Sequence, residues 1–100
     1  AMSYIQKNFQ KDLTLTEVAE ELGLSAPYFS SLFKKQTGKT FIAYLNEVRI
    51  LHSMTLLKQG ERDMQHIAVQ CGYYNKKYFF QIFKRISGQT ITEYLQEDHP

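Results

Sequence analysis

The sequence contains one cysteine, no tryptophan and two prolines among its 100 residues. Because Cys71 has no partner, an internal disulfide is excluded, and nothing indicates an oxidising compartment. No apolar run reaches the roughly 18 residues that a membrane span requires, and no signal peptide opens the chain. We therefore expect a cytoplasmic protein without a membrane partner. The Ala-Met start suggests a fragment of a larger protein with one vector residue in front.

Motifs that enzymes and metal sites require are also missing. There is no glycine-rich phosphate loop, no HExxH or CxxC, and no Ser-His-Asp order with supporting context. His52, His66 and His99 show no metal-ligand spacing with one another or with Cys71. Cys71 precedes Gly72, where a small apolar residue packs, so we interpret it as structural. We predict no enzymatic activity, no metal and no cofactor.

The residues that are present favour a packed domain with a polyanionic partner. Hydrophobic residues form 43% of the chain, which is enough for a core. The net charge is only +2, but the charges are segregated by position. Residues 26–39 hold three lysines and no acid, and residues 75–89 hold three lysines, one arginine and no acid. Such segregation indicates a polyanionic partner better than net charge does.

Two stretches of the chain are near copies of each other. Residues 28–38 read YFSSLFKKQTG, and residues 78–88 read YFFQIFKRISG, at an offset of 50. A shorter helical pattern precedes each copy and ends at Gly23 or Gly72, at an offset of 49. The second copy has therefore gained one residue in the turn. A helix, a glycine-containing turn and a second helix form the helix-turn-helix pattern, so the sequence predicts two such motifs.

Capping residues predict where the helices begin. The strings TLTE at 14–17 and TITE at 90–93 have the capping-box pattern, and Ser25, Asp63 and Asn75 are expected N-caps. Apolar spacing then predicts the inward faces. These comprise Leu15, Val18, Ala19 and Leu22, then Phe29, Leu32 and Phe33, and in the second copy Phe79, Ile82, Phe83 and Ile86.

Residues 41–59 contain neither glycine nor proline, and Gly60 supplies a stop. Apolar residues, among them Leu45 and Leu51, cover more than one side of this segment, so we expect one long helix buried by both flanking units. The predicted fold is all-α, with about seven helices in one integrated domain. Its parts are two helix-turn-helix subdomains at 1–40 and 60–100 and the connecting helix at 41–59.

These features resemble the DNA-binding domain of the AraC/XylS family of bacterial transcription regulators. The strings YFSSLFKKQTGKTF, YLNEVRI, CGYYNKKYFFQIFKRISG and ITEYL carry the resemblance, which extends from about Tyr4 to Gln96. It implies that helices at about 26–37 and 75–87 enter successive major grooves, about 34 Å apart, on one face of double-stranded DNA. It also implies an activator, with RNA polymerase as a partner and with a sensor, receiver or dimerisation domain elsewhere in the parent protein.

With the apolar stripes inward, helical geometry turns a second set of residues outward on each of these two helices. The resemblance implies that these residues and their immediate neighbours contact DNA, with the cations near phosphates. The candidates are Ser25, Ala26, Pro27, Ser30, Ser31 and Lys34 in the first copy, and Asn75, Lys76, Lys77, Phe80, Gln81, Lys84 and Arg85 in the second.

The chain departs from the family pattern in two places. Many members have Ser-Arg after Tyr-Phe, whereas this chain has Ser30-Ser31 and Phe80-Gln81. Arginine, the commonest reader of guanine, is therefore missing from this position in both copies. Many members also have proline after Gly-x-Thr, where this chain has Phe41 and Ile91, a change that we expect to alter only the helix start.

Some of these features have alternative interpretations. The Phe and Tyr stripes are interpreted as core and receive no binding role apart from Phe80, which could instead pack on the neighbouring unit or the missing domain. Lysine pairs at helix ends are also favoured by the helix dipole. The alternative function is a helical interaction module that binds an acidic protein. DNA binding requires two basic faces one helical turn apart, whereas a protein partner requires no such spacing.

Overall fold

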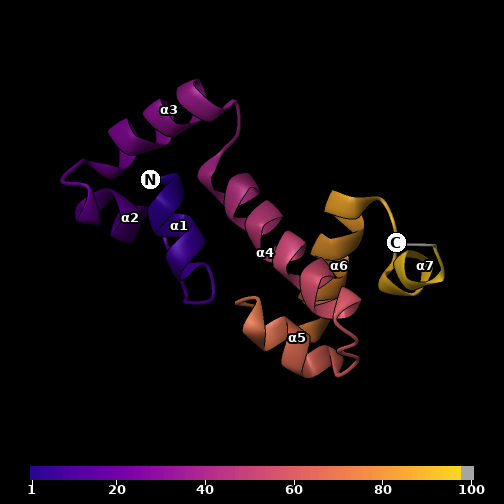
Figure 1. The fold of residues 1–100 in the computed structure, drawn as a ribbon. Helices are drawn as coiled ribbons and strands as arrows, with labels where there is room; N and C mark the ends of the chain where they lie inside the picture. Colours follow the sequence, from indigo (N-terminus) through magenta and orange to yellow (C-terminus); the bar gives the residue numbers. More distant parts are fainter. Residues whose placement is uncertain (98–100) are drawn as a thin grey trace. The chain divides into compact units, whose positions relative to one another are not determined.

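The computed structural model describes residues 1–97 and contains seven α-helices and no strand within that range (Figure 1). The all-α prediction is confirmed, while residues 98–100, including His99, lie outside the described part. None of the described helices combines the length and apolarity that a bilayer crossing needs. The helices are α1 (Met2–Asn8), α2 (Leu15–Glu21), α3 (Ala26–Thr37), α4 (Phe41–Lys58), α5 (Met64–Gln70), α6 (Lys76–Ser87) and α7 (Ile91–Gln96).

The chain divides into two compact units, Ala1–Val48 and Arg49–Pro100, with the boundary inside α4. The first unit has an aromatic centre in which the Phe29 and Phe33 rings lie 5.6 Å apart and both meet Phe41 edge-on. Apolar residues of α1 and α2 complete this first core. Its buried members are Ile5, Leu13, Val18, Ala19, Phe29, Phe33, Phe41 and Leu45.

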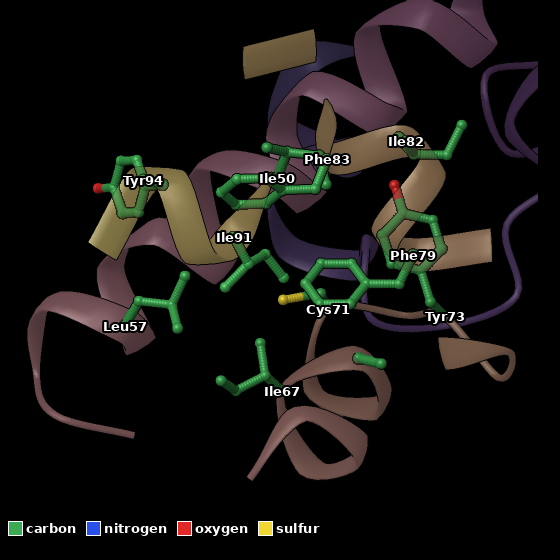
Figure 2. Close-up of a cluster of buried hydrophobic side chains, with 11 residues drawn as sticks. Ile50, Leu57, Ile67, Cys71, Tyr73, Phe79, Ile82, Phe83, Ile91 and Tyr94 are labelled. Carbon is green, nitrogen blue, oxygen red and sulfur yellow. The ribbon is translucent and has the colours of Figure 1, made fainter. Parts of the chain in front are cut away.

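The second unit repeats this arrangement with its own residues. Phe79 and Phe83 of α6 lie edge to face at 6.2 Å, and Phe83 meets Tyr94 of α7 at 5.6 Å. Figure 2 shows these rings together with apolar side chains from α4 and α5. The buried members of this second core are Ile50, Leu57, Ile67, Ala68, Cys71, Tyr73, Phe79, Ile82, Phe83, Ile91 and Tyr94.

Helix α4 contributes to both cores, but not through every apolar residue. Phe41 and Leu45 are buried in the first core, and Ile50 and Leu57 are buried in the second. The expectation that Leu51 is buried is wrong, because 62% of its surface is exposed. It lies about 100° around the helix from Ile50. Since apolar residues are spread around α4, its sequence did not reveal which side faces a core.

Most of the predicted helix starts are confirmed. The Thr14 hydroxyl accepts a hydrogen bond from the Glu17 N–H at 3.1 Å, and the Asp63 carboxylate accepts one from the His66 N–H at 3.2 Å. At Thr90 the capping box is complete, because Glu93 also accepts from the Thr90 N–H at 2.8 Å. The inward faces are confirmed except at Leu22 and Ile86, which are 41% and 36% exposed.

Exchanging Leu45 and Leu51 for alanine should separate a buried leucine from an exposed one on the same helix. Leu45→Ala leaves a cavity in the first core and should cost about 2–5 kcal/mol of unfolding free energy. Leu51→Ala should change it by less than about 0.5 kcal/mol, as surface substitutions do. Urea unfolding followed by circular dichroism measures both. Equal losses for the two variants would contradict the burial pattern of α4.

Candidate nucleic-acid interface

The helices α3 and α6 begin in the same way. Each is preceded by a residue in extended conformation whose side chain caps the first turn. The Ser25 hydroxyl accepts from the Tyr28 N–H at 3.3 Å, and the Asn75 amide oxygen accepts from the Tyr78 N–H at 3.1 Å. The caps therefore fix the first helical residue of each helix, at equivalent places in the two copies.

Their C-terminal ends also match. Gly38 and Gly88 end the helices in the left-handed region, at φ +77° and +80°, which glycine adopts without steric cost. The Thr37 and Ser87 hydroxyls donate to the carbonyls one turn back, at 2.7 and 2.6 Å. Each of the two also contacts the carbonyl two residues ahead, at 3.1 and 3.0 Å. The two helices are therefore the same length, with cations at equivalent positions in the last turn.

The turns that precede α3 and α6 differ by one residue, as predicted. The Leu24 N–H donates to the Ala19 carbonyl at 2.9 Å, and the Tyr73 N–H donates to the Ala68 carbonyl at 2.8 Å, so these positions correspond. The residue that follows is the cap Ser25 in the first unit, whereas Tyr74 intervenes before Asn75 in the second. Tyr74 is thus the inserted residue, and 72% of its surface is exposed.

On α3, four of the candidates are exposed side chains: Pro27, Ser30, Ser31 and Lys34. The other two have structural roles. Ser25 is exposed but its hydroxyl caps the helix, and Ala26 is half-buried against the first core. The exposed face of α3 is therefore formed by short side chains and ends in a lysine.

On α6, all seven candidates are exposed. The amide oxygen of Asn75 caps the helix, so its amide nitrogen takes no part in the cap. Phe80 is 39% exposed, although its ring also lies 5.8 Å from the buried Phe79. Besides the cap residue Asn75, the exposed candidates thus comprise one aromatic ring at Phe80, one amide at Gln81 and four cations. The cations are Lys76, Lys77, Lys84 and Arg85.

The last turns of α3 and α6 both carry exposed cations. Lys34 and Lys35 lie in the last turn of α3, and Lys84 and Arg85 in the last turn of α6. Within residues 1–97 none of these four forms an ion pair with a carboxylate. By contrast, Lys39 beyond the end of α3 pairs with Glu47 at 2.6 Å. Each exposed helix face is therefore positively charged.

Three tyrosines correct the interpretation of the aromatic stripes as core. Tyr28 and Tyr78 occupy equivalent positions on α3 and α6 and are 57% and 45% exposed, and Tyr74 is more exposed still. They are candidate contact residues that sequence reasoning missed. The one-residue offset between the copies was the available signal for Tyr74. For Tyr28 and Tyr78, the available signal was their position beside the phenylalanine stripe of each helix and not within it.

The thiol of Cys71 lies away from this surface. It is fully buried in the second core, and burial raises its pKa to about 12 even though the charge of Arg49 acts in the opposite direction. The Arg49 guanidinium lies 5.3 Å from the centre of the Tyr73 ring. Burial likewise raises the pKa of Tyr73. The structural interpretation of Cys71 is confirmed by its burial.

A family model described as "Helix-turn-helix domain" matches residues 18–97. The chain is 32% identical over 96 residues to the uncharacterized HTH-type transcriptional regulator YijO of Escherichia coli. The match covers 96% of this chain and 34% of that protein. It is 30% identical over 95 residues to the HTH-type transcriptional activator RhaR of Yersinia pseudotuberculosis, covering 95% of the chain and 33% of the relative.

Among solved structures, the C-terminal domain of AraT, a response regulator from Geobacillus stearothermophilus, matches with a TM-score of 0.90 and 34% identity. The match covers 99% of this chain and 88% of that one. The chain therefore spans about a third of the length of the curated relatives that it matches, but nearly all of a single domain from a response regulator.

Removing the caps should destabilise the two units separately. Asn75→Ala leaves the Tyr78 N–H without its acceptor and should lower the unfolding free energy by about 1 kcal/mol. Ser25→Ala should do the same through Tyr28. Asn75→Ser is the matched control, since serine caps as well as asparagine. Urea unfolding measures all three, and an Asn75→Ala variant as stable as Asn75→Ser would show that the cap contributes nothing.

Proposed function

Because the chain belongs to the AraC/XylS family of transcription regulators, we propose that it binds specific double-stranded DNA sequences through α3 and α6. Each helix enters a major groove, and the two grooves are successive ones on one face of the duplex. One observation supports this most. Two helices of the same length, with equivalent capping hydrogen bonds and matching cations in their last turns, present acid-free faces. Such duplication suits a ligand whose own structure repeats.

Phosphate contact is the proposed role of the cations. Lys34, Lys84 and Arg85 lie near the helix ends and reach the duplex backbone, while Lys76 and Lys77 lie at the groove entrance. Phosphate contacts orient a protein on DNA without reading its sequence. They also release counterions, so binding weakens with salt in proportion to the number of phosphates neutralised.

Base readout is assigned mainly to α6. Ser30 and Ser31 are short, so α3 fits closely into its groove but has few means to discriminate among bases. Phe80 offers an apolar contact for the thymine methyl group, and Gln81 can pair with N6 and N7 of adenine. The proposed site therefore has an A·T step beneath α6 and a weakly defined half beneath α3. Ala26 and Pro27 provide close approach rather than hydrogen bonds.

Within a longer parent protein, this domain would select the DNA sites at which the regulator acts. RhaR is named as an activator, so we propose activation, with RNA polymerase as the second partner and a sensor, receiver or dimerisation domain outside residues 1–100. The parent would act in the cytoplasm, where bacterial DNA lies. The domain division at 1–40, 41–59 and 60–100 forms part of the proposal.

Removing a phosphate-contacting cation should weaken binding without changing sequence preference. Lys84→Ala or Arg85→Ala should reduce affinity for specific and random duplexes about equally. Each should flatten the slope of log K against log salt by about one unit. Fluorescence anisotropy of labelled duplexes at several salt concentrations measures both quantities.

Lys58→Ala is the matched control, because Lys58 is an exposed lysine in the last turn of α4 and belongs to neither helix face. It should leave the slope unchanged. A variant of Lys84 that lost sequence preference but kept its salt slope would place this lysine on a base instead of a phosphate.

Selection of bound duplexes from a random pool should reveal the unequal roles of the helices. We expect stronger base preference, leaning to A·T, in the half beneath α6, with each good contact contributing about 1–3 kcal/mol of discrimination. Phe80→Ser should relax that preference while retaining the helical circular dichroism spectrum.

Phe80→Leu is the matched control, since leucine still offers an apolar surface to the thymine methyl group. It should keep the preference that serine loses. A G·C-rich sequence beneath α6, or two halves defined equally well, would contradict the assignment of readout to Phe80 and Gln81.

A further inference from the structure

A groove of about 720 Å³ runs along the exposed side of α6. Its walls come from α6 and α7, which pack against each other within the second unit (Figure 1). The residues that define this α6–α7 groove are Phe80, Gln81, Lys84 and Arg85 of α6 on one side, and Ile91, Thr92 and Leu95 of α7 on the other. Its volume falls in the range of about 300–1,000 Å³ typical of sites for small organic ligands.

The interior of the groove is mostly apolar. Ile91 is buried in the second core, and Leu95 and Met64 are half-buried against it, so their outer surfaces form a fixed floor. The partly exposed Phe80 ring stands at one edge. DNA uses little of this surface, because a duplex backbone presents charged phosphates and only the thymine methyl group would meet Phe80. The apolar floor therefore fits a ligand with an apolar body.

The polar groups of the groove favour an anion. Lys84 and Arg85 line it, and within residues 1–97 neither pairs with a carboxylate. The groove lining itself contains no acid. The neighbouring Glu93 is outside the lining, and its carboxylate accepts the N–H of the lining residue Thr90 at 2.8 Å. This hydrogen bond, with a smaller effect from the charge of Lys84, lowers the pKa of Glu93.

We propose that the α6–α7 groove binds a small amphipathic monoanion, consisting of an aromatic or aliphatic body with one carboxylate or sulfonate group. The body lies on Ile91 and Leu95, and the anionic group lies between Lys84 and Arg85. Four groove residues, Phe80, Gln81, Lys84 and Arg85, are also the proposed DNA contacts of α6, so ligand and DNA exclude one another. That exclusion rests on the proposed function, whereas ligand binding does not.

A matched pair of fluorescent probes tests the chemistry. 1-Anilinonaphthalene-8-sulfonate and N-phenyl-1-naphthylamine share an aromatic body, and only the first carries a sulfonate. The absence of tryptophan keeps the protein's own fluorescence weak. The sulfonate probe should bind with one-to-one stoichiometry, and more tightly than the neutral probe by about two- to fivefold, as exposed charge pairs allow. Equal affinities for the two probes would overturn the anion assignment.

Two glutamate substitutions on α7 test the location. Thr92→Glu places a carboxylate in the groove and should lower sulfonate-probe affinity at least about threefold. Gln96→Glu adds the same charge to the same helix outside the lining and should leave affinity unchanged within twofold. Neither residue is a proposed DNA contact. Equal effects of the two variants would overturn the site, and circular dichroism checks that both keep the fold.

Competition with DNA tests the exclusion. A duplex added at low salt should displace the sulfonate probe, and the displacement should disappear at a salt concentration that releases the DNA. If the probe stays bound while DNA binding still responds to Lys84→Ala, the exclusion is overturned and the proposed function stands. If the probe binds as expected but no duplex binds at all, the proposed function fails and the ligand site stands.

Discussion

The inward pair of phenylalanines on α3 and on α6 is the constraint on which the exposed surface depends. Phe29 and Phe33, like Phe79 and Phe83, lie four residues apart and therefore on one side of their helix. Their burial sets the rotation of each helix about its axis. Every outward side chain then has a fixed direction, and removing either pair would free the helix to turn. The cations at the helix ends face outward because the rings face inward.

Features that depend on residues close in the sequence were predictable, whereas features that depend on tertiary packing were not. Caps and helix ends were predictable, because Ser25, Asn75 and the terminal glycines act through neighbours one turn away. The exposure of Leu51 was not, since apolar residues are spread around α4 and burial depends on which tertiary neighbours cover each side. The α6–α7 groove was unpredictable for the same reason. Its walls come from separate helices whose packing no local pattern describes.

The two motifs are alike in backbone and unlike in exposed chemistry. Shared capping hydrogen bonds and matching glycine ends give α3 and α6 the same length, yet one presents Ser30 and Ser31 where the other presents Phe80 and Gln81. A duplicated framework of this kind allows the two outer faces to change independently, because neither face contributes to its core. One helix can then specialise in close approach while the other acquires discrimination and, through its groove with α7, a surface for a second ligand.

The buried thiol gives the second unit a reporter of its own. Cys71 is the single cysteine of the chain, and no counterpart exists in the first unit. With its pKa near 12 and its side chain fully buried, the thiol stays protonated and inaccessible while that core is closed. Alkylation by a thiol reagent therefore proceeds through opened molecules, at a rate set by the opening equilibrium when closing is fast. The opening equilibrium of the half of the chain that contains α6 can thus be measured separately from that of the half that contains α3, without adding any label.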